Sequence, residues 1–192
     1  LHISNGVKIK EAIGLDKLEI VGEKVVNASL TDDSKLNVDF VIVGIGITPN
    51  TDLAEGANLK INNGILINEK CQTSVSNIYA AGDCTSFKYK NTLVRLESVG
   101  NAIDQATIVA QNIMKQNTSY TPKPWFWSDQ YDLKLQIAGL NTGYDEVVVR
   151  KGESKQVSHW YYKGQCLIAI DALNDPRCYM TVSYTHLRAH ET

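Results

Sequence analysis

An apolar run that ends in small residues and a carboxylate is the part of this sequence best suited to bind a polar ligand. Residues 73–83 read TSVSNIYAAGD, and we expect residues 78–81 to form a short buried strand. Gly82 has no side chain, so a ligand can approach the backbone there, and Asp83 stands at the carboxyl end of the strand, where open α/β sheets bind ligands. An ionised Asp accepts hydrogen bonds from hydroxyl groups, which indicates a site for a sugar or polyol chain. The alternative is a buried strand followed by an Asp that caps the next turn.

A second candidate feature is the start of a predicted helix. From Ser98 onward, apolar residues recur at steps of three and four along one stripe: Val99, Ala102, Ile103, Ala106, Val109, Ala110 and Ile113. A helix N-terminus carries about half a positive charge and unpaired N–H groups, so an anion is stabilised there by about 0.3–1 kcal/mol. The alternative is an ordinary surface helix that Ser98 caps and whose dipole Glu97 complements.

The composition indicates a globular protein without nucleic-acid or membrane partners. The chain has 192 residues, 43% of them hydrophobic, and a net charge of −2, and no basic cluster offers several phosphate contacts. No run approaches the roughly 18 apolar residues of a membrane span. The four cysteines are widely spaced and form no C-x-x-C pair, which disfavours zinc or dithiol chemistry and predicts free buried thiols in a reducing cytoplasm: Cys71, Cys84, Cys166 and Cys178.

Alternation and turn residues predict the remaining elements. Residues 1–36 read as an antiparallel meander, and the almost wholly apolar residues 38–45 as a strand covered on both faces. Residues 62–64 (NNG) mark a turn before a short strand at 65–67. The polar, proline-bearing residues 116–124 predict a linker, after which period-two patterns predict an antiparallel sheet of four or five strands.

Four segments together resemble FAD-dependent ferredoxin reductases of the putidaredoxin-reductase-like and rhodocoxin-reductase-like kind. Thr73 followed by residues 80–83 (AAGD) resembles the second flavin motif of two-dinucleotide-domain flavoproteins, whose Asp holds a ribityl hydroxyl of FAD. Residues 38–50 look like the strand and turn that return from the nicotinamide domain to the flavin domain, and residues 95–106 resemble the helix beside the flavin ring. Residues 124–131 (PWFWSDQY) are the most specific piece and are similar to the start of the family's C-terminal domain.

The resemblance implies an α/β fold, here a partial two-dinucleotide-binding-domain (FAD/NAD(P)-binding) flavoprotein reductase with a C-terminal α+β antiparallel-sheet domain. Residues 1–64 would belong to the NAD(P)-binding domain and crossover, residues 65–117 to the FAD-binding domain, and residues 124–180 to the reductase C-terminal domain. Neither G-x-G-x-x-G fingerprint of the family occurs, because residues 44–49 (GIGITP) lack the third glycine and place a proline where the helix should begin. We therefore expect a C-terminal fragment that holds half of a flavin site and binds FAD poorly alone.

By the same resemblance, a hydride passes from NADH or NADPH to FAD, and single electrons then leave to a [2Fe–2S] ferredoxin of an oxygenase system. Asp83 would bind the ribityl chain, Glu97 would touch the nicotinamide amide, and Trp127, the expected catalytic residue, would stack near the flavin ring. The expected cofactor-binding residues are Gly82, Asp83, Glu97, Ser98, Val99 and Trp127. The nicotinamide donor is not specified, because the residues that read its ribose lie upstream.

Other interpretations remain open. A disulfide or peroxide reductase on the same scaffold would carry its redox cysteine upstream of this segment. An apoptosis-inducing-factor-like protein would use the fold as a redox-sensitive binding partner, and long insertions in the C-terminal domain would support that. Without the resemblance, Trp125, Phe126 and Trp127 would be interpreted as core anchors, and the resemblance reverses this interpretation for Trp127. The candidates for electrostatic docking of the ferredoxin are Arg95, Lys134 and Arg150.

The end of the chain departs from the family pattern. Residues 181–192 (TVSYTHLRAHET) stand where a helix is expected and resemble translated adapter sequence, so we expect a non-native tail. His186 and His190 are four apart, a spacing that binds metal on a helix, but we expect no metal site. Loss of the closing helix would expose an apolar face of the C-terminal sheet, which predicts aggregation or a homodimer.

Overall fold

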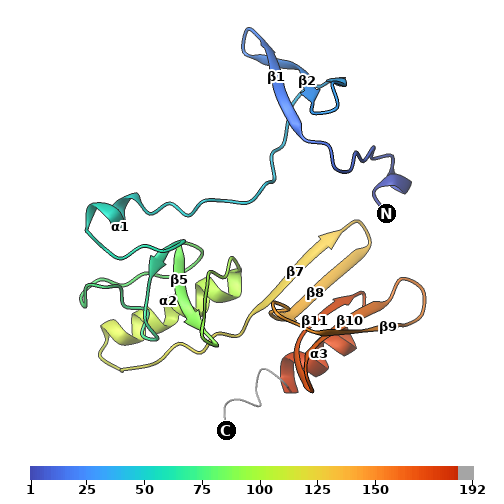
Figure 1. Ribbon diagram of the computed structural model, residues 1–192. Coiled ribbons are helices and arrows are strands. Elements are labelled where there is room, and N and C mark those ends of the chain that lie inside the picture. The colour runs from blue at the N-terminus through green and yellow to red at the C-terminus, as the bar shows by residue number, and fades with distance from the viewer. Residues whose placement is uncertain (186–192) are drawn as a thin grey trace. The chain divides into compact units, whose positions relative to one another are not determined.

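The computed structural model describes residues 1–185 of the chain. The chain divides into two compact units, Leu1–Ile47 and Thr48–Thr192, which are described separately below. Figure 1 shows the elements of both units along the chain.

The first unit is built on a three-stranded antiparallel meander. After a 3₁₀ turn at Ile3–Asn5, strands β1 (Leu15–Val21), β2 (Lys24–Leu30) and β3 (Lys35–Asn37) pair in chain order. Ala28 lies on the central strand and is 5% exposed, as the period-two pattern requires. The predicted meander is therefore confirmed from residue 15 onward, whereas the stretch around Val7 and Ile9 forms no strand.

The buried strand predicted at residues 38–45 is wrong. This stretch has no regular secondary structure, and Phe40, Ile42 and Ile45 are 72%, 85% and 91% exposed. A strand exists by hydrogen bonding to neighbouring strands, and the sheet of the first unit ends at β3. The apolar run therefore has no paired strand beside it among the described residues.

The second unit begins with a small mixed sheet and one long helix. A short helix α1 (Asp52–Gly56) leads to β4 (Ile65–Leu66), which pairs in parallel with β5 (Thr85–Tyr89), and β5 forms a hairpin with β6 (Thr92–Val94). Helix α2 (Val99–Ile113) follows. The core here gathers Ile67, Cys71, Phe87 and Tyr120, with Ile108 and Val109 of α2 packed against it.

Helix α2 confirms the predicted helix, but much of its apolar stripe is exposed. Val99, Ile103 and Ile113 are 57%, 60% and 62% exposed, whereas Asn101 and Gln105 are 5% and 0% exposed. The helix buries these polar residues because their side chains bond to neighbouring loops, as described below. The spacing of the apolar residues therefore predicts the helix correctly, but it does not indicate which side of the helix is buried.

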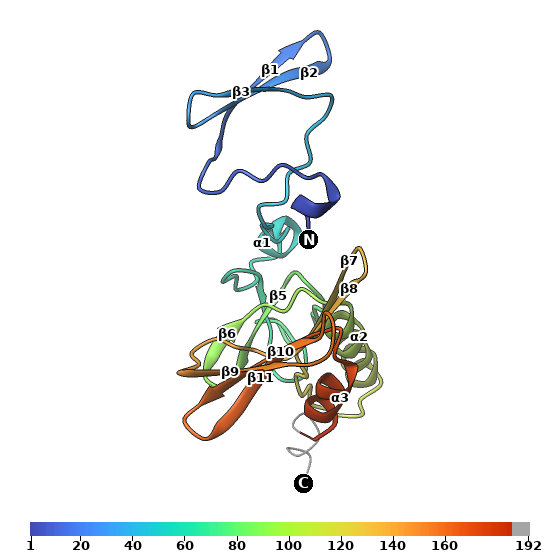
Figure 2. The same cartoon turned by 90° about the vertical axis from the view of Figure 1, so that its right-hand side faces the viewer.

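The C-terminal part is a five-stranded antiparallel sheet with a helix packed against it. The strands are β7 (Trp125–Gln130), β8 (Leu133–Gly139), β9 (Glu146–Lys151), β10 (Val157–Lys163) and β11 (Cys166–Leu173), in the spatial order β7-β8-β11-β10-β9. Helix α3 (Pro176–Thr185) packs against β8 and β11 (Figure 2). The predicted antiparallel sheet and the irregular linker before it are confirmed.

Helix α3 corrects the expected loss of a closing helix. Residues 181–185 belong to α3, and Val182 is 3% exposed within the core of Ala138, Trp160, Ile170 and Ala172. Because α3 covers part of the sheet, the argument for a homodimer from an uncovered sheet loses its premise. The homodimer and the foreign origin of the tail stay predictions.

Candidate functional site

The expected strand before Asp83 is replaced by an irregular segment and a turn. Residues 78–81 form no strand; this stretch is held by a single bridge between Gln72 and Tyr79 and by the bond from the Ala80 N–H to the Cys71 carbonyl (3.1 Å). Too few partners flank this stretch for a ladder to form. Gly82 and Asp83 open a turn that leads into β5, so Asp83 precedes a strand instead of following one.

Gly82 is required by its backbone conformation. Its φ angle is +88°, in the left-handed region that favours glycine, whereas an added Cβ would meet Ala102 of α2 at an ordinary 3.6 Å. The turn is closed by a bond from the Thr85 N–H to the Gly82 carbonyl (3.0 Å). Asp83 is therefore one of the two central residues of a tight turn beside α2.

Two buried side chains hold this turn against the helix. The Gln105 Oε1 atom accepts hydrogen bonds from the Gly82 N–H (2.7 Å) and from the Thr85 hydroxyl (2.9 Å). The Thr85 hydroxyl also lies 2.8 Å from the Gly82 carbonyl. Gln105 and Thr85 are both 0% exposed, so the turn is fixed from the interior of the protein.

Asp83 itself presents its carboxylate outward. The residue is exposed, and none of residues 1–185 donates a hydrogen bond to the carboxylate. Its backbone carbonyl accepts a bond from Arg95 Nη1 (3.3 Å). The main chain of Asp83 is thus restrained while its side-chain oxygens remain available to hydroxyl donors, as the proposed polyol site requires.

Arg95 and Glu97 form an ion pair next to the turn. Arg95 Nη1 lies 2.6 Å from Glu97 Oε1, and the side chains are 10% and 46% exposed. Arg95 Nε is buried without a partner among the described residues. Arg95 is therefore largely buried and already bonded to Glu97 and to the Asp83 carbonyl, which makes it a poor candidate for docking a ferredoxin.

The start of α2 is capped and tied to the core. The Ser98 hydroxyl oxygen accepts a bond from the Asn101 N–H (3.2 Å), and Asn101 also bonds to the Leu96 carbonyl (3.0 Å) and accepts from the Tyr120 hydroxyl (2.6 Å). Burial raises the pKa of Tyr120, so the phenol stays a donor. At the exposed Val99, where α2 begins, the backbone N–H has no acceptor within the helix.

A pair of stacked tryptophans meets the same helix end. Trp125 packs so closely on Gly100 that a Cβ there would overlap the indole. Trp127 stacks on Trp125 with ring centroids 5.2 Å apart and planes 19° apart, and it is 38% exposed. Gly100 thus joins β7 to the first turn of α2, and Trp127 keeps an accessible flat ring.

Helix α2 is the element that brings the expected residues together. The turn at Gly82 bonds to α2 through Gln105, and the tryptophan pair packs on α2 at Gly100. Sequence reasoning located Asp83 and Val99 but missed Gln105. Local periodicity carried no signal for it, because two polar residues four apart, as Asn101 and Gln105 are, ordinarily indicate the exposed face of a helix.

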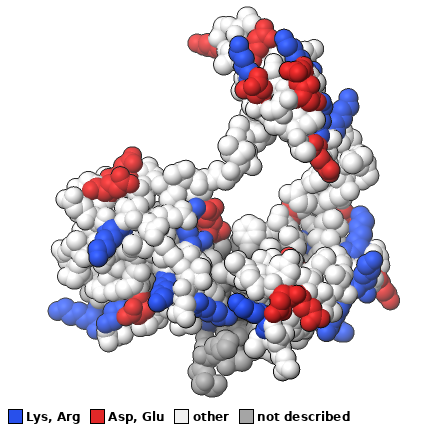
Figure 3. Space-filling view, viewed as in Figure 1, with Lys and Arg blue, Asp and Glu red and all other residues white. Residues whose placement is uncertain are grey.

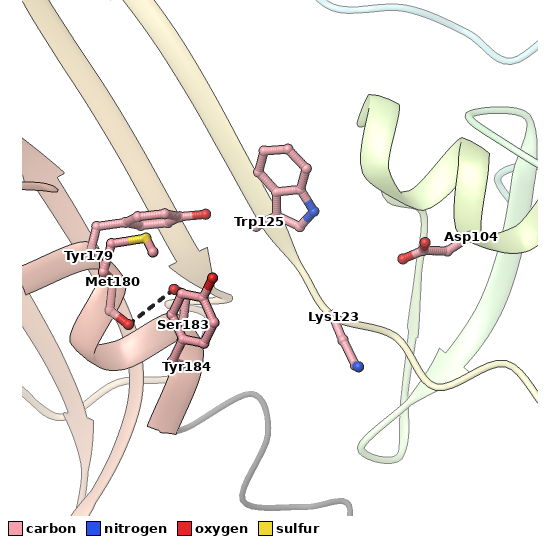
Figure 4. A pocket seen from close by; sticks show the side chains of 7 residues that line it. All are labelled: Asp104, Lys123, Trp125, Tyr179, Met180, Ser183 and Tyr184. Carbon is pink, nitrogen blue, oxygen red and sulfur yellow. Dashed lines mark hydrogen bonds between the residues drawn. The ribbon is translucent and has the colours of Figure 1, made fainter.

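A cavity of about 340 Å³ lies beside this region, between α2, the linker and α3 (Figure 4). Its walls are Asp104, Lys123, Trp125, Tyr179, Met180, Ser183 and Tyr184. Trp127 lines a neighbouring cavity of about 210 Å³ instead. Neither cavity includes Asp83 or Val99, so the candidate site rests on the turn and the helix start, where the polar groups converge.

Cysteine and metal chemistry have little support within residues 1–185. All four cysteines are free, but Cys166 is exposed, so the expectation of buried thiols holds fully for Cys71 alone. Burial raises the pKa of Cys71 to about 11, which keeps the thiol protonated. The described residues contain no cluster of three or more metal-ligating side chains, and His186 and His190 lie outside them.

The described helices are too short or too polar to cross a lipid bilayer. Positive and negative side chains are interspersed on the face that Figure 3 shows. Arg150 lies over the Trp160 ring, 4.2 Å from its centroid, so its guanidinium already has a partner.

Comparison with known families gives two matches along the chain. Residues 1–106 match the pyridine nucleotide-disulphide oxidoreductase family, and residues 125–187 match the reductase C-terminal family. The second match includes residues 181–187 of the expected tail.

Similar proteins are ferredoxin-type reductases by name. The chain is 37% identical over 182 residues to rhodocoxin reductase of Rhodococcus erythropolis, covering 93% of this chain and 43% of that protein. It is 39% identical over 181 residues to putidaredoxin reductase of Pseudomonas putida, covering 92% and 43%. The crystal structure of the covalent putidaredoxin reductase–putidaredoxin complex matches with a TM-score of 0.89 at 37% identity, over 96% of this chain and 45% of that chain. The chain therefore spans less than half the length of these relatives, and it belongs to the pyridine nucleotide-disulphide oxidoreductase family.

Proposed function

We propose that this chain is part of an FAD-dependent ferredoxin reductase that takes electrons from NADH or NADPH and passes them to a [2Fe–2S] ferredoxin. The observation that carries the proposal is the outward carboxylate of Asp83, on a turn that Gln105 locks to α2. The similarity to rhodocoxin reductase and to putidaredoxin reductase supports a ferredoxin as the acceptor. The free cysteines support a reducing compartment, which we propose is the cytoplasm.

The residues present fit one half of an FAD site. An unbonded carboxylate at Asp83 suits a ribityl hydroxyl, and the start of α2 at Val99, before the first intrahelical bond, suits the electron-rich edge of a flavin ring. The glycine fingerprint that would hold the pyrophosphate does not occur in the sequence.

When bound, FAD supplies hydride acceptance from the nicotinamide and release of electrons one at a time. The helix start favours negative charge at the ring edge by about 0.3–1 kcal/mol. Trp127 would offer a flat apolar surface to the ring, and Ser98 keeps the helix start in place. Glu97 has less support as a nicotinamide ligand than the other residues have for their roles, because its carboxylate already forms an ion pair with Arg95.

The ferredoxin would dock through exposed basic side chains. Among the three expected cations, Arg95 and Arg150 have partners within the chain, so Lys134 is the candidate we retain. The match of residues 125–187 to the reductase C-terminal family favours a ferredoxin reductase over the disulfide-reductase and apoptosis-inducing-factor-like alternatives.

The test uses the full-length protein encoded by the gene, with Asp83→Ala and the matched surface variant Asp16→Ala. Wild type and Asp16→Ala should bind FAD, lose flavin colour when NADH or NADPH is added, and reduce putidaredoxin. Loss of a hydrogen bond to a charged group, about 1.5–3 kcal/mol, should weaken FAD binding of Asp83→Ala roughly 10- to 150-fold. A wild-type protein that takes up no FAD, or an Asp83→Ala variant with unchanged affinity, would contradict the proposal.

A further inference from the structure

We infer that Gln105 is a positioning residue for cofactor binding, which fixes from inside the protein the backbone turn that carries the Asp83 carboxylate. The inference rests on the proposed function. Gln105 lies on α2, is 0% exposed, and is separated from Asp83 by more than twenty positions in sequence. It acts through the turn and not by touching the cofactor.

Both ends of the turn depend on one oxygen atom. Gln105 Oε1 accepts from the Gly82 N–H at 2.7 Å and from the Thr85 hydroxyl at 2.9 Å. These are the first and last residues of the four-residue turn whose centre contains Asp83. A shift of Gln105 would therefore move both anchors of Asp83 together.

A third restraint acts on Asp83 itself, since its carbonyl accepts from Arg95 Nη1. With the flanking residues and the carbonyl fixed, the remaining freedom of Asp83 is its side-chain rotation. Pre-positioned acceptors bind more tightly because less entropy is lost when the ligand arrives.

The burial of Gln105 is otherwise unfavourable. An amide that leaves water without full hydrogen bonding destabilises the protein, and Gln105 Nε2 is buried with no partner among the described residues. An apolar residue would pack there without that penalty. The side chain is thus kept for its oxygen, and the oxygen serves the Gly82–Thr85 turn.

A purely structural role makes a different prediction, and the same helix offers the control. Asn112 lies two turns further along α2 and also bonds to loops: it donates to the carbonyls of Lys70 (3.1 Å) and Thr118 (2.8 Å) and accepts from the Thr118 N–H (2.8 Å). None of these bonds touches the Gly82–Thr85 turn. Replacing Asn112 therefore removes comparable bonds without moving Asp83.

The experiment compares Gln105→Met, Thr85→Val and Asn112→Leu in the full-length protein. The measurements are the FAD dissociation constant, the visible spectrum of bound flavin and the melting temperature of the FAD-free protein. We expect Gln105→Met to weaken FAD binding at least tenfold and to shift the flavin spectrum. Thr85→Val should weaken binding severalfold, since the Gly82 N–H keeps its acceptor. Asn112→Leu should lower the melting temperature while changing FAD affinity less than twofold.

Equal FAD affinity of wild type and Gln105→Met would overturn the inference while leaving the proposed function standing. So would an Asn112→Leu variant that loses as much affinity as Gln105→Met. If Gln105→Met does not fold, Thr85→Val decides, because an unchanged affinity in that variant also overturns the inference. A wild-type protein without FAD would overturn both the inference and the proposed function.

Discussion

Replacing Gly64 with alanine should loosen the strand that supports the Asp83 turn. Gly64 has a φ angle of +126°, and an added Cβ would lie 2.8 Å from the Cys84 carbonyl oxygen and 2.9 Å from Ser86 Oγ. The next residue, Ile65, donates its N–H to the same Cys84 carbonyl (2.8 Å), which begins the pairing of β4 with β5. The substitution therefore strains the backbone and crowds this pairing at one point.

The two costs are of similar size. A non-glycine residue in a sparsely populated backbone region costs about 1–3 kcal/mol, and crowding of a packed site costs about 1–3 kcal/mol. Reduced freedom of the unfolded chain returns about 0.4–1 kcal/mol. The expected net loss is about 1–5.6 kcal/mol in the local stability of β4 and β5.

Native-state hydrogen exchange of the amides in residues 62–89 measures this local free energy of opening. Gly56→Ala is the control, because Gly56 ends α1 and an added Cβ there meets no atom within 4 Å. Adding Ser86→Ala to Gly64→Ala removes one contact but leaves the Cys84 carbonyl and the φ angle, so most of the loss should persist. A loss below about 1 kcal/mol for Gly64→Ala, or full recovery with Ser86→Ala, would refute this reasoning.

Four further outcomes follow from the same structure. The 192-residue chain alone should bind FAD much more weakly than the full-length protein, as flavin fluorescence titration would measure, and one tightly held FAD per chain would contradict this. Because burial raises the pKa of Cys71 to about 11, above its value in the unfolded chain, the stability that this thiol contributes is complete below about pH 9 and is lost as the pH rises through about 11; Cys71→Ala should flatten that decline in denaturation curves. Trp127→Ala in the full-length protein should slow ferredoxin reduction in stopped-flow measurements more than Trp127→Phe does, since Phe keeps a flat ring, and equal rates would count against a role for the ring. Arg150→Gln should destabilise the C-terminal sheet by about 0.5–1 kcal/mol through loss of the contact with Trp160, measured by urea unfolding, and an unchanged midpoint would show that the contact is without net effect.

Periodicity predicted the long, regularly patterned elements. The meander from residue 15 onward, helix α2 and the five-stranded sheet were all predictable, because alternation and three-to-four spacing describe one element against one core. The apolar stretches at 38–45 and 78–81 failed because a strand needs neighbours, and the apolar pattern does not say whether they exist. Apolar runs alone therefore overpredict strands in this chain.

The motif residues of the candidate site were predictable from the sequence, but the side chain that holds them in place was not. The resemblance located Asp83 and Val99, but Asp83 lies before a strand and not after one. Gln105 was missed, because a side-chain bond to Gly82, across 23 positions, leaves no mark on local periodicity. Asn101 and Gln105, the most deeply buried side chains of α2, are polar because they form hydrogen bonds with neighbouring segments.

The central claim is that the Gly82–Asp83 turn and the start of α2 hold the flavin. A crystal structure of the full-length protein with bound FAD tests it most directly. We predict that the Asp83 carboxylate lies within hydrogen-bonding distance of a ribityl hydroxyl and that the backbone at Val99 faces the flavin ring. A bound FAD that leaves the Asp83 carboxylate in solvent and the start of α2 without contact would contradict the account.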